Sequence, residues 1–222
     1  MIDAAISILL RRSKDTQYVV GGPEKRIFDL LISFVMFLSL SPLIVIVAML
    51  VKLADHGPVI FCHTRVGYDG RRFQCLKFRS MVINADEVLR RLLDSDPESR
   101  QEWERTQKLA KDPRITPLGK FLRQSSLDEL PQLINVIRGE MSLVGPRPVI
   151  PSELKRYDEK LGLYLKARPG ITGIWQVSGR SDCCYDERIK MDADYVRNWR
   201  FSKDFVILLR TLIAVFARRG SF

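Results

Sequence analysis

The chain has 222 residues and a net charge of +10, from 36 lysine and arginine against 26 aspartate and glutamate residues. This length fits one moderate domain, or a short membrane segment with one soluble domain. The positive charge is typical of proteins with anionic partners, although a solubilising basic surface explains it equally well. The four cysteines form no CxxC pair, which favours a reduced, cytosol-facing protein, and two histidines argue against a zinc site.

The N-terminal segment does not have the order of a signal peptide. A short apolar start precedes Arg11, Arg12 and Lys14, whereas in a signal peptide the charges come first. We therefore expect residues 1–24 to form a poorly ordered or surface-bound tail.

Residues 27–51 are apolar apart from one aspartate, three serines and one proline. Their number exceeds the roughly 20 residues that a helix needs to span a bilayer. A buried core helix is the alternative interpretation. We therefore predict a membrane helix over residues 25–52, followed by a soluble domain over residues 53–222.

Ser41-Pro42 lies near the middle of this apolar segment. Proline removes a backbone donor and clashes with the preceding turn, so the helix should bend there, and the serine hydroxyl can satisfy a freed carbonyl. Each arm is too short to cross a hydrocarbon core of about 30 Å. A sharp bend gives a re-entrant helix and a modest bend gives a spanning one. Basic residues on both flanks favour re-entry, with both ends cytoplasmic.

Residues 59–66 and 72–78 are predicted to form a β-hairpin, because two β-rich runs flank the turn sequence Gly67-Tyr68-Asp69-Gly70. Strand alternation places Lys77 and Arg79 on one face. Residues 84–111 are charged and favour a long helix, with four possible core contacts at Leu89, Leu92, Leu93 and Trp103.

Residues 112–119 are predicted to be a loop from their prolines and glycine, and a helix is expected to begin near residue 130. Ser126 and Glu129 match a capping box, which would give Glu129 a purely structural role. The alternative is chemical. At a helix start, Asp128 and Glu129 would be favoured as anions, and such a site also binds phosphate.

Adjacent carboxylates can hold different roles because neighbouring side chains on a helix diverge. One can attack phosphorus while the other binds Mg²⁺, which prefers oxygen ligands and would screen an anionic diphosphate. Arg147 lies between two prolines, and this stiff backbone would present its guanidinium to a phosphate at little entropic cost. A rigid surface turn is the alternative. Neither a P-loop nor a dinucleotide-binding fingerprint is present.

From about residue 25 to residue 222 the chain resembles the bacterial sugar transferases, the small monotopic phosphoglycosyl transferases. Within the family it is most similar to the hexose-1-phosphate transferases that initiate exopolysaccharides of the succinoglycan type. The resemblance rests on these motifs: Lys25-Arg26-Ile27-Phe28-Asp29, Ser41-Pro42, Leu76-Lys77-Phe78-Arg79-Ser80-Met81, Ser126-Leu127-Asp128-Glu129-Leu130-Pro131-Gln132, Gly145-Pro146-Arg147-Pro148 and Arg168-Pro169-Gly170-Ile171-Thr172-Gly173.

The resemblance implies a re-entrant helix broken at Ser41 and Pro42. It also implies that Asp128 is the nucleophile that takes the sugar phosphate and releases UMP, and that Glu129 binds Mg²⁺. The residues implied to lie near the phosphates or the uridine are Lys77, Arg79, Arg123 and Arg147. The implied reaction transfers a hexose 1-phosphate, with galactose or glucose as the hexose, from a UDP-sugar to undecaprenyl phosphate.

We therefore predict an α+β fold: a mainly helical cytosolic domain with a small β-hairpin, attached to an N-terminal re-entrant membrane helix. The predicted location is the cytoplasmic face of the bacterial inner membrane. The predicted partners are a UDP-sugar, undecaprenyl phosphate and the membrane, but no nucleic acid; homodimerisation is left open. The rival hypotheses are a nonenzymatic membrane scaffold and a basic nucleic-acid-binding protein.

The C-terminal segment allows two interpretations. Its apolar residues form a broad surface, with Arg210, Arg218 and Arg219 near it: Phe205, Val206, Leu208, Leu209, Leu212, Ile213, Val215 and Phe216. This pattern predicts either a core helix or a helix that lies in the lipid headgroup layer, where arginines meet anionic lipids.

Overall fold

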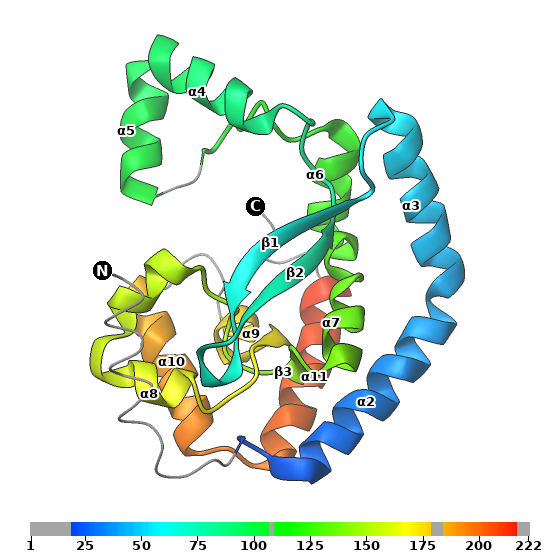
Figure 1. Ribbon diagram of the computed structural model, residues 1–222, viewed down its shortest axis with the longest axis vertical. Coiled ribbons are helices and arrows are strands. Elements are labelled where there is room, and N and C mark those ends of the chain that lie inside the picture. Colours follow the sequence, from blue (N-terminus) through cyan, green and yellow to red (C-terminus); the bar gives the residue numbers. More distant parts are fainter. Residues whose placement is uncertain (1–18, 107–108, 179–183, 217–222) are drawn as a thin grey trace.

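The structure is a computed structural model, and it describes residues 19–106, 109–178 and 184–216. Most of the tail expected over residues 1–24, namely residues 1–18, lies outside the described residues, as do Arg218 and Arg219. The end of that tail is wrong, because helix α2 already begins at Gly22. Mostly helical elements surround a long β-hairpin (Figure 1), so an α+β class with a mainly helical domain is confirmed. Two features extend from this domain on different sides, a bent pair of apolar helices and a short arm of two charged helices.

The predicted hairpin is confirmed. Strands β1 (Ile60–Val66) and β2 (Arg72–Phe78) pair antiparallel, with Phe61 opposite Lys77. Between them lies the short turn η1 (Tyr68–Gly70), in which Asp69 and Gly70 adopt positive φ angles. Such angles are typical of tight hairpin turns, and the Gly67–Gly70 sequence supplies residues that tolerate them.

The long helix expected over residues 84–111 is divided in two. Helix α4 (Ala85–Ser95) ends at Asp96, which is extended, and α5 (Pro97–Thr106) begins with a proline. Pro97 suits a first helical position but cannot continue a helix, which explains the break. The expected core contacts are also wrong, because Leu89, Leu93 and Trp103 line a groove between the two helices.

The loop expected over residues 112–119 ends earlier than predicted. Helix α6 (Pro117–Gln124) begins inside it, because the Thr116 side chain accepts a hydrogen bond from the Gly119 amide at 2.9 Å. A threonine cap followed by a proline is a typical helix start. The turn η2 (Leu127–Glu129) and helix α7 (Gln132–Arg138) follow.

The apolar segment forms two helices, α2 (Gly22–Ser39) and α3 (Ser41–Asp55), whose axes are bent by 62°. The break at Ser41-Pro42 is therefore confirmed, and the Ser41 hydroxyl donates to the Leu38 carbonyl at 2.8 Å. Among the described residues, no single helix is long and apolar enough to cross a membrane; the bent pair reaches that length and composition only when its arms are combined.

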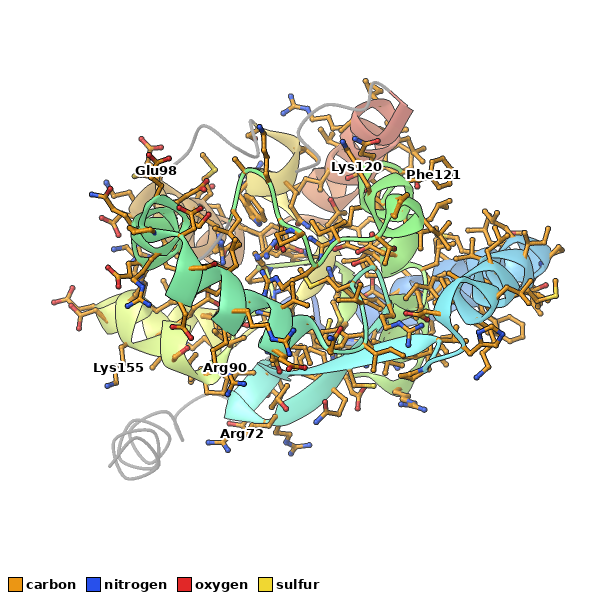
Figure 2. The ribbon with its side chains drawn as sticks, turned by 90° about the horizontal axis from the view of Figure 1, so that it is seen from above. Arg72, Arg90, Glu98, Lys120, Phe121 and Lys155 are labelled. Carbon is orange, nitrogen blue, oxygen red and sulfur yellow. The ribbon has the colours of Figure 1, made fainter. Side chains whose placement is uncertain are left out.

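Both arms of the bent pair pack against the domain along part of their length: one side of α2 lies on the largest apolar core, and Val47 and Val51 of α3 lie in a smaller cluster with Phe78. Many large apolar side chains along both arms are exposed: Ile27, Leu31, Phe34, Val35, Leu38, Val45, Ile46, Met49, Leu50 and Leu53. Seen from above, the pair projects from one side, whereas Glu98 and Lys155 lie on the opposite side (Figure 2).

A second, parallel sheet pairs β3 (Ser142–Val144) with β4 (Gly170–Thr172). The segment between them contains η3 (Pro151–Lys160) and α8 (Leu161–Tyr164). After β4 come α9 (Ile174–Val177), α10 (Tyr185–Arg197) and α11 (Phe201–Phe216). The largest apolar core joins α7 and β3 to α10 and α11, with part of α2 packed against it.

Helix α11 confirms the core interpretation of the C-terminal segment on one of its faces. Asp204 and Ile207 are buried, so one face packs on the core. Phe205, Leu209 and Ile213 are about half exposed or more, and this apolar face has no covering element in the described part of the chain. The side chains of Val215 and Phe216 lie outside the described residues.

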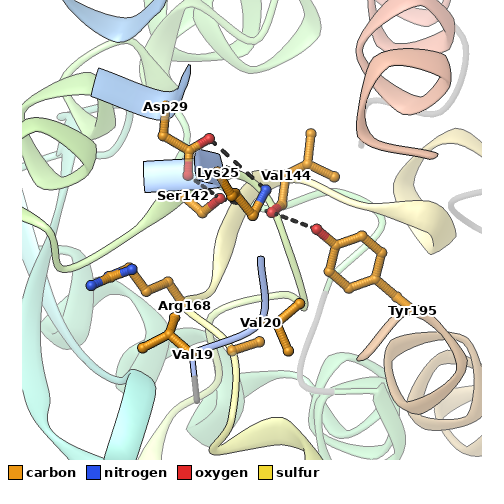
Figure 3. A pocket seen from close by; sticks show the side chains of 9 residues that line it. Val19, Val20, Lys25, Asp29, Ser142, Val144, Arg168 and Tyr195 are labelled. Atoms are coloured by element: carbon orange, nitrogen blue, oxygen red, sulfur yellow. Dashed lines mark hydrogen bonds and ion pairs between the residues drawn. The ribbon is translucent and has the colours of Figure 1, made fainter. Parts of the chain in front are cut away.

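A buried polar network joins α2 to α11 and β3; Figure 3 shows its Lys25, Asp29, Ser142 and Tyr195 side chains. The Lys25 ammonium lies between the Asp29 and Asp204 carboxylates, and all three side chains are at most 7% exposed. Asp29 accepts from the Ser142 hydroxyl at 2.7 Å, and Asp204 from the Tyr195 hydroxyl at 2.7 Å. The adjoining cavity of about 10 Å³ is at most the size of one water molecule, so it leaves no room for a ligand.

Replacing Lys25 with methionine preserves most of the side-chain volume but removes the cation between two buried carboxylates. Because breaking a buried ion pair costs about 3–5 kcal/mol, we expect the free energy of unfolding to fall by about this amount in urea denaturation in detergent micelles. Lys190→Met, at an exposed site on α10, is the control and should change stability by less than about 0.5 kcal/mol. Equal stability of the two variants would contradict the role assigned to Lys25.

Candidate active site

Asp128 and Glu129 lie in the 3₁₀ turn η2, between helices α6 and α7. The alternative of a capping box at Ser126 is wrong. Ser126 has a φ angle of 57° and its side chain caps nothing, so Glu129 is not held by a reciprocal cap. A left-handed conformation is costly for a residue with a side chain, and such residues concentrate at functional sites.

Leucines on either side of the carboxylate pair fix the turn against α3. Leu127 and Leu130 pack on a buried cluster that contains Val47 and Val51 of α3 and Phe78 of β2. Because side chains on both sides of Asp128 are anchored, the turn can hold an unfavourable backbone angle. The pair is thereby placed beside the second arm of the bent helices.

Asp128 is 8% exposed, and burial raises the pKa of its carboxyl to about 6. The Lys77 and Arg123 charges oppose this shift, whereas the Glu129 carboxylate adds to it. We expected a helix start to favour the anion, but desolvation is the largest influence. The side chain is therefore mostly ionised at neutral pH and protonated in acid.

Lys77 donates to Glu129 Oε1 at 2.6 Å, and both side chains are about one third exposed. The hairpin brings Lys77 to this position because β2 is attached to α7. Asn135, fully buried on α7, donates to the Gln74 carbonyl at 2.7 Å and accepts from the Leu76 amide at 3.0 Å. One asparagine side chain therefore extends the hydrogen bonding of the strand onto the helix that follows the carboxylate pair.

Arg123 lies on the last turn of α6 and donates from Nε to the Ser80 hydroxyl at 2.8 Å. Helix α6 approaches this closely because of Gly119, where an added Cβ would lie 1.9 Å from the Ser80 carbonyl oxygen. Burial lowers the pKa of Arg123, while the Asp128 and Asp112 carboxylates counteract the change. Arg123 and Asp128 thus lie within electrostatic reach of each other.

Arg147 follows β3, and its guanidinium carbon lies 5.2 Å from the centre of the Trp175 ring. Burial lowers its pKa, the Arg188 charge lowers it further, and Glu129 raises it. The structure therefore brings Arg147 near the acidic pair. Arg79 is different, since its guanidinium pairs with Asp55 at the end of α3.

The acidic pair has the chemistry to hold a magnesium ion. Carboxylate oxygens are hard donors, and Mg²⁺ is commonly held by one or two protein carboxylates together with substrate phosphates. Within the described residues, no cluster of three or more His, Cys, Asp or Glu side chains has the arrangement of a metal site. Asp128 and Glu129 therefore fit a site that substrate oxygens complete, and they do not fit a metal cage made of protein alone.

Several residues that shape the site were not singled out from the sequence. Asn135 could have been noticed as a polar residue inside the apolar pattern of α7, and Ser80 and Trp175 lie in or beside recognised motifs. Arg188 has no local signal. It reaches the site because α10 packs on α9, which places Arg188 over Trp175 at 5.0 Å.

The chain matches known proteins over most of its length. The bacterial sugar transferase family model matches residues 21–218. The chain is 50% identical over 203 residues to the exopolysaccharide production protein ExoY of Sinorhizobium fredii, covering 91% of this chain and 90% of the relative.

Two longer relatives carry more explicit names. The undecaprenyl-phosphate galactose phosphotransferase of Salmonella typhimurium is 50% identical over 198 residues, covering 89% of this chain and 41% of that protein. The UDP-glucose:undecaprenyl-phosphate glucose-1-phosphate transferase of Escherichia coli is 37% identical over 207 residues, with coverage of 89% and 41%. The family match extends over both helices of the bent pair and the whole site, and the chain therefore belongs to the bacterial sugar transferase family.

Proposed function

We propose that this chain transfers a hexose 1-phosphate, with galactose or glucose as the hexose, from a UDP-sugar to undecaprenyl phosphate. This reaction releases UMP and begins the synthesis of an exopolysaccharide repeat unit. The names of the relatives support the donor, the acceptor and the group transferred. The observation that carries the proposal is the enclosed Asp128 carboxylate, with Glu129 adjacent to it and Lys77 and Arg123 within electrostatic reach.

The proposed chemistry is a double displacement. An Asp128 oxygen attacks the phosphorus that carries the hexose, the bond from this phosphorus to the UMP oxygen breaks, and UMP leaves. An oxygen of undecaprenyl phosphate then attacks the same phosphorus, and the Asp128 carboxylate is released. Lys77, Arg123 and Arg147 stabilise the negative charge on the phosphate oxygens during both steps.

Glu129 and Asp128 would hold Mg²⁺, with Glu129 as its main ligand. The ion would screen the charge between the anionic nucleophile and the anionic diphosphate. Before the ion binds, the contact with Lys77 orients the Glu129 carboxylate. Arg79, which pairs with Asp55 at the end of α3, is proposed to bind a phosphate that arrives from the membrane side.

The bent pair α2–α3 is proposed to enter the membrane from the cytoplasmic side and return to it. The exposed apolar side chains along both arms and the 62° bend support re-entry. The exposed apolar face of α11 would lie in the headgroup layer nearby. Phe28 of α2 and Phe201 of α11 are in edge-to-face contact at 4.9 Å, so the two apolar surfaces adjoin.

The nucleophile can be tested by trapping. With UDP-hexose and Mg²⁺ but no lipid, wild-type protein should release one equivalent of UMP and gain the mass of a hexose phosphate on the peptide that contains Asp128. Asp128→Asn should reduce turnover by at least about a thousandfold and form no adduct. Asp186→Asn, at an exposed site on α10, is the control and should retain both.

UMP release that requires the lipid, with no adduct at any quench time, would favour direct transfer. Asp128 would then act as a general base on the lipid phosphate. Glu129→Gln should mainly raise the Mg²⁺ concentration needed for half-maximal rate. A panel of UDP-galactose, UDP-glucose and their N-acetyl forms identifies the sugar, and transfer from none of them would reject the proposed function.

The pH dependence follows from the raised pKa of Asp128. Only the carboxylate attacks, so the rate of lipid-independent UMP release should be half maximal near pH 6 and should fall as the pH decreases. Lys77→Met removes a charge that lowers this pKa and should shift the midpoint upward. Glu129→Gln removes a charge that raises it and should shift the midpoint downward. If the pH midpoints of the two variants equal the midpoint of the wild type, a group other than Asp128 controls the pH profile.

Re-entry predicts that both ends of the bent pair share one side. Single cysteines at the exposed positions Glu24 and Lys190, in a background without native cysteines, should both resist membrane-impermeant maleimide in intact cells and react after permeabilisation. Pro42→Leu should straighten the helix and expose the residue 24 cysteine to the reagent. If the residue 24 cysteine alone is labelled in the protein that keeps Pro42, the segment spans the membrane instead.

A further inference from the structure

Two arginines share one tryptophan at the edge of the site. The guanidinium carbons of Arg147 and Arg188 lie 5.2 and 5.0 Å from the centre of the Trp175 ring. Arg188 also lies 4.7 Å from the centre of the Tyr185 ring, so aromatic contacts hold its side chain. Such stacking fixes the plane of a guanidinium and leaves its edge to bind something else.

Among the residues that the structure describes, the edge of the Arg188 guanidinium has no hydrogen-bond partner. Its Nε and Nη2 atoms are buried and make no hydrogen bond to the described residues, and the same holds for Trp175 Nε1. Nε and Nη2 together form the fork that matches two oxygens of a phosphate or carboxylate. Buried polar groups without partners are rare, so a set of three donors on adjacent side chains indicates an acceptor that binds there.

The neighbouring carboxylates do not fill this role. Asp192, one helical turn beyond Arg188, is buried and accepts from the Tyr157 hydroxyl at 3.0 Å and from the Arg147 backbone amide. Glu153 lies 3.8 Å from Arg65. Arg156 adds another positive charge, 4.7 Å from the Tyr185 ring. The cluster therefore suits an anion with several oxygens, and Arg147 connects it to the acidic pair.

We propose that the Arg188 fork and Trp175 Nε1 form, with Arg147, a binding pocket for a phosphate group of a reaction substrate. The inference rests on the proposed function for the identity of that phosphate, which belongs either to the nucleotide or to the polyprenyl lipid. It places the group on the β3–β4 side of the carboxylate pair, away from Arg79 and α3. Arg188 is thereby a substrate-binding residue contributed by α10.

Equilibrium binding tests the nucleotide as the source. With purified protein in detergent and Mg²⁺, UMP and uridine are titrated calorimetrically. Arg188→Gln should weaken UMP binding about ten- to hundredfold and leave uridine unchanged, because a charge-assisted bidentate contact is lost. Arg188→Lys keeps the charge without the fork and should lose less. Trp175→Phe keeps the ring without the donor and should lose about three- to tenfold.

The lipid is tested in the complete reaction and by discharge of the trapped adduct. If the lipid phosphate occupies the pocket, Arg188→Gln should raise the KM for undecaprenyl phosphate and slow discharge, with UMP binding unchanged. Arg197→Gln, at an exposed site on the same helix, is the control and should match the wild type within twofold in every assay.

The proposed pocket is overturned if Arg188→Gln and Trp175→Phe both behave like Arg197→Gln in UMP affinity, in the KM for the lipid and in the rate of adduct discharge. If Arg188→Gln fails to fold, Arg188→Lys and Trp175→Phe decide the same question. If the wild type transfers no sugar phosphate but Arg188→Gln still weakens UMP binding, the proposed function is rejected and the pocket is retained.

Discussion

The buried contact of Lys25 with Asp29 and Asp204 joins the first described helix to the last. Together with the Arg26 guanidinium, which donates to the Val136 and Ile137 carbonyls of α7, this contact supplies polar interactions that hold the apolar arm α2 against the domain. Because the contact is enclosed, its geometry is specific in a way that apolar packing alone is not. It fixes where the bent pair starts, and the bend then determines where α3 meets the domain.

The candidate active site lies beside α3, the second arm of the bent pair. Leu127 and Leu130 pack on a cluster shared with α3, while Asn135 ties α7 to the strand that carries Lys77. The acidic pair is thus held between an apolar support and a hydrogen-bonded one. This arrangement places a phosphate-transfer site next to the helix that would enter the membrane, where a lipid phosphate and a soluble nucleotide can both reach it.

Local chemistry made the hairpin and the break at Ser41-Pro42 predictable, because turn glycines and prolines act on their immediate neighbours. Pro97 and Thr116 carry comparable local signals, for a helix break and for a helix cap. The capping motif at Ser126 is different, because its residue types do not reveal the left-handed backbone that prevents the cap. Contacts such as Lys25 with Asp204, or Arg188 with Trp175, join distant segments, and no pattern within either segment reveals its partner.

The enclosure of Asp128 has a consequence for side reactions. A mixed anhydride between a carboxylate and a phosphate is reactive. Water competes with the acceptor lipid for reaction with this anhydride, and water is far more abundant. With Asp128 only 8% exposed, few water molecules reach the carboxyl carbon of such an anhydride. In the proposed double displacement, this shielding would limit hydrolysis at that carbon, so less activated sugar would be lost while the acceptor lipid diffuses in.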